Sequence, residues 1–520
     1  MSDCLRLLRV PFVVAVGMLS IIACDTTDST APATTITVAV FDRGEISAAE
    51  GTMANNRWTT MINDRLSDLR VEFRSYPRRE ALQSWDLELA VNSAPDLMSI
   101  YWGVWLQQKA YSGHVLALDD LIEEHAPNYV EVVGRDFIRA YGTVEGRIFL
   151  LPSRRENTAQ DVLWARRDWM ENLGLDPPVT SDDFRELIRA FAFDDPNRSG
   201  TNDTVGGALN HRLIDLVFAA FGVRYGSVVN PYNVKDGTVV FAHEMPGFWP
   251  AVEYMRAVYE DGGIDPDFIQ PGYDNRVHLM AYDGTLGVYA KNADWGRRLV
   301  RATREHTASS DWTVLPLFRT AYGHHPYLET FPASLTGIIN ARSESPEAVL
   351  RYVDFQAGSA AQMLLTYGEE GRHYRLVDGL AIEIDPELNR LEQSYASNSS
   401  YFILRAPGIS SPAEAMERSA RTADPILARG FELQGQALSL LGVPYAFSPL
   451  VLPTYLPMAS EFHDPLKQFL EDTVIKAIVG GDVYTIRHAQ EELVAGLETR
   501  AYQSVKTELN SARRLQSQTQ

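Results

Sequence analysis

The N-terminal part of the chain alternates short apolar runs with stretches in which apolar residues recur at helical spacing. Residues 35–41 (TITVAVF) are mostly β-branched or aromatic and are bounded by polar residues, which predicts a buried strand. Further strands are predicted at 71–76 and 94–101, with helices at about 56–69 and 79–91 between the three strands. This order of strand, helix, strand, helix, strand predicts a parallel α/β sheet with right-handed crossovers.

The same alternation continues through the rest of the chain. Short strands are predicted at 235–241 and 283–289, and a helix with apolar residues at helical spacing is predicted at 248–262. A capped amphipathic helix is expected at 345–355, and a last helix at about 485–501. With 520 residues the chain is too long for one ordinary hydrophobic core, so a division into two lobes is expected.

Composition and charge narrow the functional class. Hydrophobic residues make up 45% of the chain and aromatic residues 10%, which is typical of a folded, soluble body. The formal net charge of −21 argues against nucleic acid or an anionic membrane surface as a partner. The acidity favours solubility and does not identify a ligand.

The N-terminus has the pattern of a bacterial lipoprotein signal. Arg6 and Arg9 precede an apolar stretch at 11–23, which is too short to span a bilayer comfortably. The stretch ends in SIIAC, with Cys24 as the expected site of lipid attachment; an ordinary secretory peptide is the alternative. Since the one other cysteine, Cys4, lies in the part that would be removed, the mature body is expected to lack disulfides and catalytic thiols.

Residues 195–203 (DPNRSGTND) have the spacing of a calcium-binding loop. The expected oxygen ligands, with the Thr201 backbone carbonyl among them, belong to Asp195, Asn197, Ser199, Thr201 and Asp203. Gly200 stands where such a loop turns sharply, but Gly206 occupies the twelfth position, where a bidentate glutamate belongs in an EF-hand. The alternative is an Asx-rich surface turn that binds no ion.

Several segments, in order along the chain, resemble the extracellular solute-binding lipoproteins of bacterial ABC transporters, in the oligosaccharide-type, long-chain branch (family 1). The segments are 94–97 (APDL), 112–122 (SGHVLALDDLI), 146–152 (GRIFLLP), the run 162–184 that leads into the calcium-type loop, 365–374 (LTYGEEGRHY) and 472–480 (DTVIKAIVG). The resemblance covers most of the chain after Cys24.

The resemblance implies an α/β protein with the two-lobed periplasmic-binding-protein type II fold, each lobe a sheet flanked by helices and a hinge between the lobes. It also implies a monomer on the extracytoplasmic face of the membrane that delivers an oligosaccharide to the transmembrane subunits of an ABC permease, with a structural calcium ion. The expected segments are a signal peptide at 1–23, a lipidated tether at 24–34, lobe 1 at 35–152 and about 330–395, lobe 2 at 153–329 and about 396–505, and a polar, fraying tail at 506–520.

Aromatic residues at predicted strand ends are the main candidates for sugar contacts. An indole ring can cover the flat C–H face of a sugar while polar side chains bind the hydroxyl groups. Arginine forks could bind a uronate carboxylate, although a solvated surface pair is the alternative for the two adjacent arginines. The predicted substrate-binding residues are Trp102, Trp105, Arg154, Arg155, Trp295, Glu329 and Tyr374.

No catalytic motif stands out in the sequence. The chain has no His-Glu-x-x-His zinc helix, P-loop, Gly-x-Gly-x-x-Gly after a strand or Gly-x-Ser-x-Gly elbow. His324 and His325 are adjacent to Pro326, which fits a loop better than a metal site. The expected function is therefore capture without catalysis. The alternatives are a surface lipoprotein glycosidase or lyase, and a peptide-binding or sensory receptor.

Overall fold

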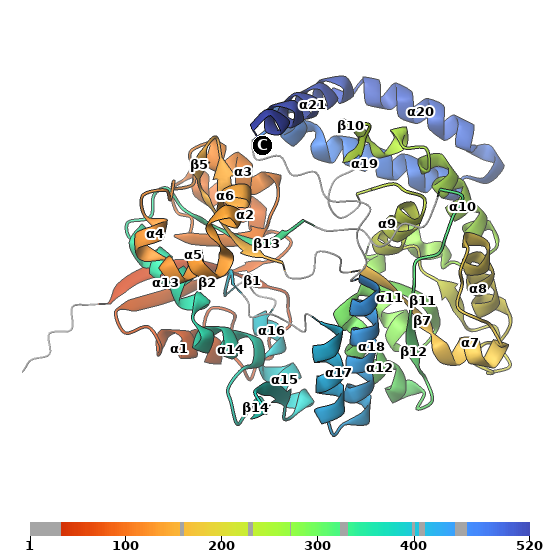
Figure 1. Ribbon diagram of the computed structural model, residues 1–520, viewed down its shortest axis with the longest axis horizontal. Helices are drawn as coiled ribbons and strands as arrows, with labels where there is room; N and C mark the ends of the chain where they lie inside the picture. Colours follow the sequence, from red (N-terminus) through yellow and green to blue (C-terminus); the bar gives the residue numbers. More distant parts are fainter. Residues whose placement is uncertain are drawn as a thin grey trace, which may run out of the picture.

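The computed structural model describes residues 33–155, 161–226, 232–270, 272–322, 331–397, 401–404, 411–441 and 455–519. These residues form two lobes that lie side by side, each a β-sheet with helices around it (Figure 1). The predicted signal peptide with Cys24, most of the tether, the adjacent histidines and Glu329 lie outside the described residues. The expected α/β fold with two lobes is confirmed.

Lobe 1 is built on a five-stranded sheet with the strand order β2-β1-β3-β13-β6. Its elements are β1 (Thr34–Asp42), α1 (Arg57–Asn63), β2 (Leu69–Pro77), α2 (Ala81–Ala90), β3 (Leu97–Tyr101), α3 (Val104–Tyr111), α4 (Ile122–His125), α5 (Pro127–Val133), α6 (Arg135–Gly142), β4 (Thr143–Val144), β5 (Arg147–Ile148), β6 (Leu150–Arg154), β13 (Ala333–Ile339), α13 (Pro346–Ala357), α14 (Ser359–Tyr367), β14 (Tyr374–Val377), β15 (Leu380–Glu383), α15 (Pro386–Glu392) and α16 (Ser394–Ser397).

The first three strands of lobe 1 are parallel, as the alternation of strands and helices predicts. β1 pairs with β2 over its whole length, and with β3 at Val38. β13 arrives from much later in the chain and pairs antiparallel with both β3 and β6. The sheet is therefore mixed. Because β13 lies between β3 and β6, the two places where the chain leaves and re-enters lobe 1 are neighbours in the sheet.

Lobe 2 is built on a four-stranded sheet with the strand order β12-β7-β11-β8. Its elements are β7 (Asp161–Arg166), α7 (Arg167–Leu173), α8 (Ser181–Phe193), β8 (Val205–Gly207), α9 (His211–Ala220), β9 (Tyr232–Lys235), β10 (Thr238–Phe241), η1 (Ala242–Glu244), α10 (Phe248–Glu260), η2 (Pro266–Ile269), α11 (Tyr273–Tyr282), β11 (Leu286–Asn292), η3 (Ala293–Trp295), α12 (Gly296–His306), β12 (Trp312–Leu315), α17 (Pro412–Arg421), α18 (Pro425–Leu441), α19 (Pro457–Val479), η4 (Gly481–Val483), α20 (Ile486–Glu498) and α21 (Tyr502–Thr519).

Each lobe has its own apolar core. Trp164, Trp169 and Trp312 are fully buried in lobe 2, as the apolar pattern around them predicts. In lobe 1 Trp58 and Trp85 are fully buried on the two faces of the sheet. Burial of apolar side chains is the main favourable contribution to folding, so each lobe gains stability from a core of its own.

The chain crosses between the lobes several times. It leaves lobe 1 after β6, returns at β13, and leaves again between Leu404 and α17. The α17–α18 hairpin packs on α12 in lobe 2, but the buried Arg418 of α17 donates hydrogen bonds to the Ala381 carbonyl (2.5 Å) and the Tyr367 hydroxyl (2.8 Å) of lobe 1. A side chain of one lobe is thus held by groups of the other.

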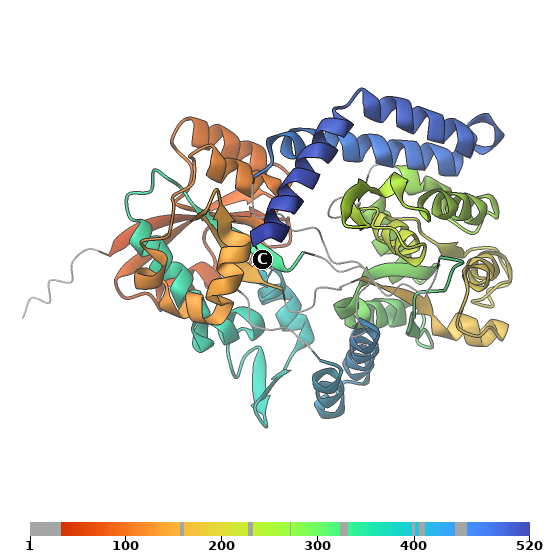
Figure 2. The ribbon, with the colours of Figure 1, turned by 45° about the horizontal axis from the view of Figure 1, so that its top comes forward.

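The C-terminal part of the structure differs from the prediction. Residues 502–519 form helix α21; α19 and α20 lie along the outside of lobe 2, and α21 runs from them towards lobe 1 (Figure 2). Tyr502, Val505 and Leu509 are buried in the lobe 2 core, and their spacing puts them on one helix face. The expectation of a fraying tail is wrong because those apolar positions attach the helix to the core. Residues 401–404 pack in lobe 1, beyond the boundary expected at about 395.

None of the helices in the described part of the chain has both the length and the apolar character that crossing a membrane requires.

Candidate functional site

An aromatic cluster lies in lobe 1 where the chain leaves and re-enters that lobe. Trp102 follows β3 directly, and its ring stacks on Phe331, which precedes β13, with ring centroids 3.8 Å apart and an interplanar angle of 17°. Tyr141 of α6 packs edge-on against Phe331 (5.2 Å), and its backbone carbonyl accepts a hydrogen bond from the Trp102 indole N–H (3.0 Å). Phe331 is buried, whereas Trp102 is half-buried. The buried Phe331 and the half-buried Tyr141 therefore hold the Trp102 ring in place.

The two predicted arginines lie beside this cluster. Arg155 donates from its backbone N–H to the Pro332 carbonyl (2.8 Å) and from Nε to the Phe331 carbonyl (3.2 Å). Arg154 is exposed; it donates from Nη2 to the Val133 carbonyl (3.1 Å), and its guanidinium lies 4.7 Å from the centre of the Phe137 ring. The structure thus brings Trp102, Arg154 and Arg155 to one end of the lobe 1 sheet.

Trp105 does not join the cluster, although it lies three residues after Trp102. Helix α3 begins at Val104 and turns Trp105 towards α2, where its ring packs against Trp85 (5.8 Å) and its indole N–H donates to Asp86 (3.0 Å). Lys109 pairs with the same Asp86 carboxylate at 2.6 Å. The structure therefore packs Trp105 on α2 and does not bring it into the cluster around Trp102, and its predicted contact with substrate stays a prediction.

Tyr374 is likewise a buried packing residue. Only 5% of its surface is exposed, and its ring contacts Tyr367 at 5.7 Å. Burial raises the pKa of its hydroxyl. The sequence predicts ligand contact at the turn 369–374. The structure instead uses this turn to attach the β14–β15 region to the body of lobe 1.

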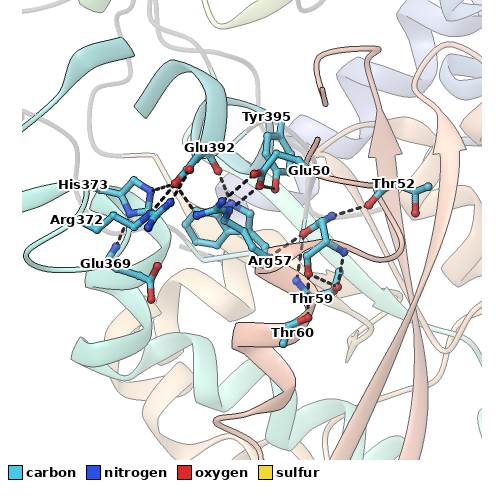
Figure 3. A network of polar contacts seen from close by, with 12 residues as sticks. Glu50, Thr52, Arg57, Thr59, Thr60, Glu369, Arg372, His373, Glu392 and Tyr395 are labelled. Atoms are coloured by element: carbon cyan, nitrogen blue, oxygen red, sulfur yellow. Dashed lines mark hydrogen bonds and ion pairs between the residues drawn. The ribbon is translucent and has the colours of Figure 1, made fainter. Parts of the chain in front are cut away.

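An ion network around Glu392 of α15 attaches the turn at 369–374 to the body of lobe 1 (Figure 3). The Glu392 carboxylate accepts from Arg57 (2.5 Å) and from Arg372 (2.7 and 2.8 Å). His373, which is fully buried, accepts from the Glu369 backbone N–H at Nδ1 (2.9 Å), so its proton is on Nε2, which donates to Glu392 (3.1 Å). Bonds from Arg372 first, and then from His373, lower the pKa of Glu392 to about 2.

In lobe 2, Trp295 is the centre of a second cluster, which we call the lobe 2 cluster. Trp295 ends the short η3 helix after β11, and its half-buried ring stacks with two side chains of α11, His278 (4.9 Å, 20°) and Tyr282 (6.0 Å, 12°). The Lys291 ammonium and the Arg298 guanidinium lie 4.3 and 5.1 Å from the ring centre. We define the cluster as these five residues: Trp295, His278, Tyr282, Lys291 and Arg298.

The lobe 2 cluster lies where the chain enters lobe 2. Asp161 begins β7, only a few residues after Arg155, and pairs in register with Asn292, the last residue of β11. Lys291 therefore lies at the end of the lobe 2 sheet where the chain enters this lobe. Both aromatic clusters are thus close to the first crossing segment, one at each of its ends.

Sequence reasoning identified Trp102, Arg154, Arg155 and Trp295 but missed their partners. Phe331 could have been noticed, since it stands two residues after the predicted Glu329 in the run that leads into β13. Lys291 stands two residues after the strand predicted at 283–289. His278 carries no sequence signal, because its place beside Trp295 depends on how α11 packs on β11.

The calcium-type loop follows α8 and forms a compact group of oxygen atoms. The Asp195 carboxylate accepts from the backbone N–H groups of Ser199 (2.9 Å) and Gly200 (3.1 Å). Asp203 Oδ1 accepts from the Asn197 amide (2.9 Å) and the Ser199 hydroxyl (3.1 Å). These bonds, the one from Asn197 first, lower the pKa of Asp203, so its carboxylate is ionised at neutral pH.

The donor set of this loop fits a hard cation. The Ser199 hydroxyl contacts both the backbone carbonyl (3.2 Å) and the hydroxyl (2.9 Å) of Thr201, so all five predicted ligands lie in one hydrogen-bonded group. Two carboxylates and neutral oxygens are the donors that Ca²⁺ prefers. No set of three or more His, Cys, Asp or Glu side chains among the described residues is arranged to hold a metal ion. The loop therefore depends on its hydroxyl, amide and carbonyl oxygens.

Comparison with known proteins agrees with this architecture. Over 338 residues the chain is 23% identical to the fructooligosaccharide ABC transporter substrate-binding protein FusA of Streptococcus pneumoniae, covering 61% of this chain and 57% of FusA. Over 274 residues it is 24% identical to the polygalacturonan/rhamnogalacturonan-binding protein YtcQ of Bacillus subtilis, covering 51% of this chain and 52% of YtcQ. The chain thus spans about half the length of these curated relatives.

A solved structure shows the same fold over almost the whole molecule. The structure of the S. pneumoniae FusA EF-hand mutant in complex with fructo-nystose matches with a TM-score of 0.68 at 18% identity, covering 94% of this chain and 100% of that one. The model of the family described as bacterial extracellular solute-binding protein matches residues 67–363, which is more than half of the chain. The chain therefore belongs to the bacterial extracellular solute-binding proteins.

Proposed function

We propose that this protein is the substrate-binding lipoprotein of an ABC importer, which captures an oligosaccharide or related glycan between its lobes and delivers it to the permease. The observation that carries the proposal is the position of one indole in each lobe, Trp102 and Trp295, at opposite ends of the first crossing segment. Sugar rings bind well to such aromatic surfaces with polar groups beside them. The names of FusA and YtcQ support a glycan as the ligand class.

The proposed mechanism is a change in the angle between the lobes. A ligand that contacts both clusters gains more interactions when the lobes approach, and only such differential affinity can shift the balance towards the closed form. The permease would then recognise the closed shape. The ligand leaves chemically unchanged, because the family is one of binding proteins and we assign no catalytic group.

A binding assay with oligosaccharides tests this proposal. Replacement of Trp102 by alanine is expected to weaken binding roughly 10–100-fold, because loss of a buried aromatic contact costs about 1.5–3 kcal/mol. Trp105→Ala is the matched control: it removes the same side chain from α3, where Trp105 packs on α2, and should change the Kd less than about 3-fold. Isothermal titration calorimetry gives the Kd, and small-angle scattering reports closure.

Two results would contradict the proposed function. Absence of binding for every carbohydrate, together with unchanged small-angle scattering, would refute the proposed function. The appearance of new reducing ends during incubation with a bound glycan would show an enzyme instead.

We propose a structural calcium ion in the loop at 195–203, held by Asp195, Asn197, Ser199, the Thr201 carbonyl and Asp203. The oxygen-rich geometry of this loop supports the proposal, and the FusA protein solved as an EF-hand mutant is a structural neighbour that agrees with it. Calcium at about 100 times its Kd would add about 2.7 kcal/mol of stability. Chelation by EDTA is therefore expected to lower the melting temperature by several degrees. An Asp195→Ala variant should not respond to EDTA, and an unchanged wild-type melting temperature would mean that the loop binds no ion.

Membership of the family places the protein outside the cytoplasm, and we propose that a lipid on Cys24 anchors it there as a monomer. The apolar stretch that ends in SIIAC supports this, because it has the length and small-residue ending of a lipoprotein signal. Mass spectrometry of the N-terminal peptide from purified membranes tests it: an unmodified Cys24 would contradict the anchor.

A further inference from the structure

Two cations of the lobe 2 cluster lie beside an indole and, within the described ranges, have no carboxylate in contact to neutralise them. The Lys291 ammonium and the Arg298 guanidinium both approach the Trp295 ring. Among the residues that the structure describes, no Asp or Glu oxygen lies within 4.0 Å of either cation. This is unusual in a chain with a net charge of −21, where most cations could find an acidic partner.

The acidic groups nearby are already engaged. Asp161 pairs with Arg212 of α9, and Asp274 of α11 accepts from His211 at 3.1 Å. Asp294 attracts Lys291 electrostatically, but it is exposed and not in contact with the ammonium. Asp274 and Asp161 also attract Lys291 electrostatically, but their contacts are with His211 and Arg212, so within the described ranges neither carboxylate touches Lys291 or Arg298.

The partial burial of Lys291 makes its charge unfavourable in free energy as long as no carboxylate contacts it. Its side chain is half-buried, and its one hydrogen-bond partner among the described residues is Nε2 of His278, at 2.7 Å. Burial first, and then the Arg212 charge, lowers the pKa of Lys291 to about 8, so it is still mostly protonated at neutral pH. Burial also lowers the pKa of His278 to about 4, so the imidazole is neutral and can accept the bond from Lys291.

A ligand can relieve this cost only if it brings a negative charge. A buried charge is favourable when it is paired and unfavourable when it is alone. A neutral sugar would cover Lys291 without compensating its charge, whereas a carboxylate would pair with it and retain the His278 contact. The exposed Arg298 is close enough to the same ring to attract the anion as it approaches.

We propose that the lobe 2 cluster makes this protein selective for acidic oligosaccharides, with the carboxylate of a uronate residue bound by Lys291 and attracted by Arg298. The inference rests on the proposed function, because it names the substrate class of the same site. The polygalacturonan in the name of YtcQ is a polymer of this class.

The test compares charged and neutral sugars of equal length. The probes are trigalacturonate, trimannuronate and triguluronate, the methyl ester of trigalacturonate, and neutral galactose and mannose trisaccharides. We expect at least one free acid to bind, its affinity to fall with added salt, and its ester and neutral counterpart to bind roughly 10–100-fold more weakly. Lys291→Met should weaken binding of the acid by a similar factor, because removing one partner of a half-buried ion pair is costly.

The matched control is Lys476→Met. Lys476 lies on α19, is exposed and pairs with Glu492 at 3.0 Å, so its loss should leave every Kd unchanged within about 3-fold. A second readout separates charge recognition from a structural role. Lys291→Met removes a half-buried charge that no described carboxylate contacts, so without ligand it should melt at the same temperature as the wild type or higher.

Each remaining outcome overturns the inference. Tighter binding of neutral sugars than of all acids would refute the acidic specificity and leave the proposed function in place. A bound acid whose Kd does not change in Lys291→Met would refute the role of Lys291. Absence of binding for every carbohydrate would remove the proposed function and the inference together.

Discussion

Replacement of Gly206 by glutamate is expected to unfold lobe 2, although it would complete the EF-hand pattern of the calcium-type loop. Gly206 lies in β8, and a Cβ atom on it would be 2.0 Å from the backbone carbonyl oxygen of Ile188 in α8 and 2.8 Å from that of Gly263. Backbone atoms on both sides cannot move aside as a flexible side chain could. The variant must displace helix α8 from the sheet, which we expect to cost more than about 4 kcal/mol.

Thermal unfolding followed by circular dichroism, with calcium and with EDTA, measures this effect. Gly206→Ala should be nearly as unstable as Gly206→Glu, because the clash involves Cβ and not the carboxylate. Asn202→Glu is the matched control: it adds the same charge at an exposed position of the loop and should melt within a few degrees of the wild type. A Gly206→Glu protein that melts at or above the wild-type temperature would contradict the packing argument.

Replacement of Glu392 by glutamine is expected to destabilise lobe 1 by about 3 kcal/mol at neutral pH. The ion network lowers the pKa of this carboxyl from about 4.5 to about 2, and each pKa unit corresponds to about 1.4 kcal/mol. The Glu392 side chain is 11% exposed, so solvent screens the network little. The variant also leaves Arg372 without its carboxylate, and its single amide oxygen cannot accept all the bonds that Arg372 and His373 donate to the two carboxylate oxygens.

The loss of stability in Glu392→Gln is expected to become smaller as the pH falls. Because the pKa of Glu392 is lower in the folded protein than in the unfolded chain, its contribution is complete above about pH 4.5 and is lost as the pH falls towards 2. The stability difference between wild type and Glu392→Gln should therefore shrink over that range. Glu387→Gln is the control, since Glu387 is exposed and pairs with Arg390 on the surface. A difference that stays constant from pH 7 to pH 3 would contradict the network's role.

The parts of the fold that sequence predicted well are those set by local periodicity. The apolar run at 35–41 became β1, and the helical pattern at 248–262 became α10, because alternation and helical spacing are properties of a few adjacent residues. The antiparallel insertion of β13 between β3 and β6 has no local signature. It depends on a pairing between residues far apart in the chain.

The candidate site follows the same division. Trp102 and Trp295 were selected from the sequence because Trp102 directly follows the strand predicted at 94–101 and Trp295 lies shortly after the one predicted at 283–289, and ligands bind beyond strand ends in α/β proteins. Trp105 was predicted for the same reason, but helix α3, which begins at Val104, directs its ring towards Trp85 of α2. The stack of Trp102 on Phe331 and the bond from Lys291 to His278 join residues from separate elements, so only the folded structure brings them together.

The bonds from Arg418 to lobe 1 limit the ways in which the two halves of the molecule can move. The guanidinium is anchored on α17 and held by the Ala381 carbonyl and the Tyr367 hydroxyl, while Arg421, one turn later, donates to the Val377 carbonyl at 2.7 Å. A rotation about this point would keep these short bonds, whereas a sliding or twisting displacement of several ångströms would break the bonds from Arg418 and Arg421 to lobe 1. These contacts therefore favour a rotation of the two lobes about this point over a sliding of one lobe along the other.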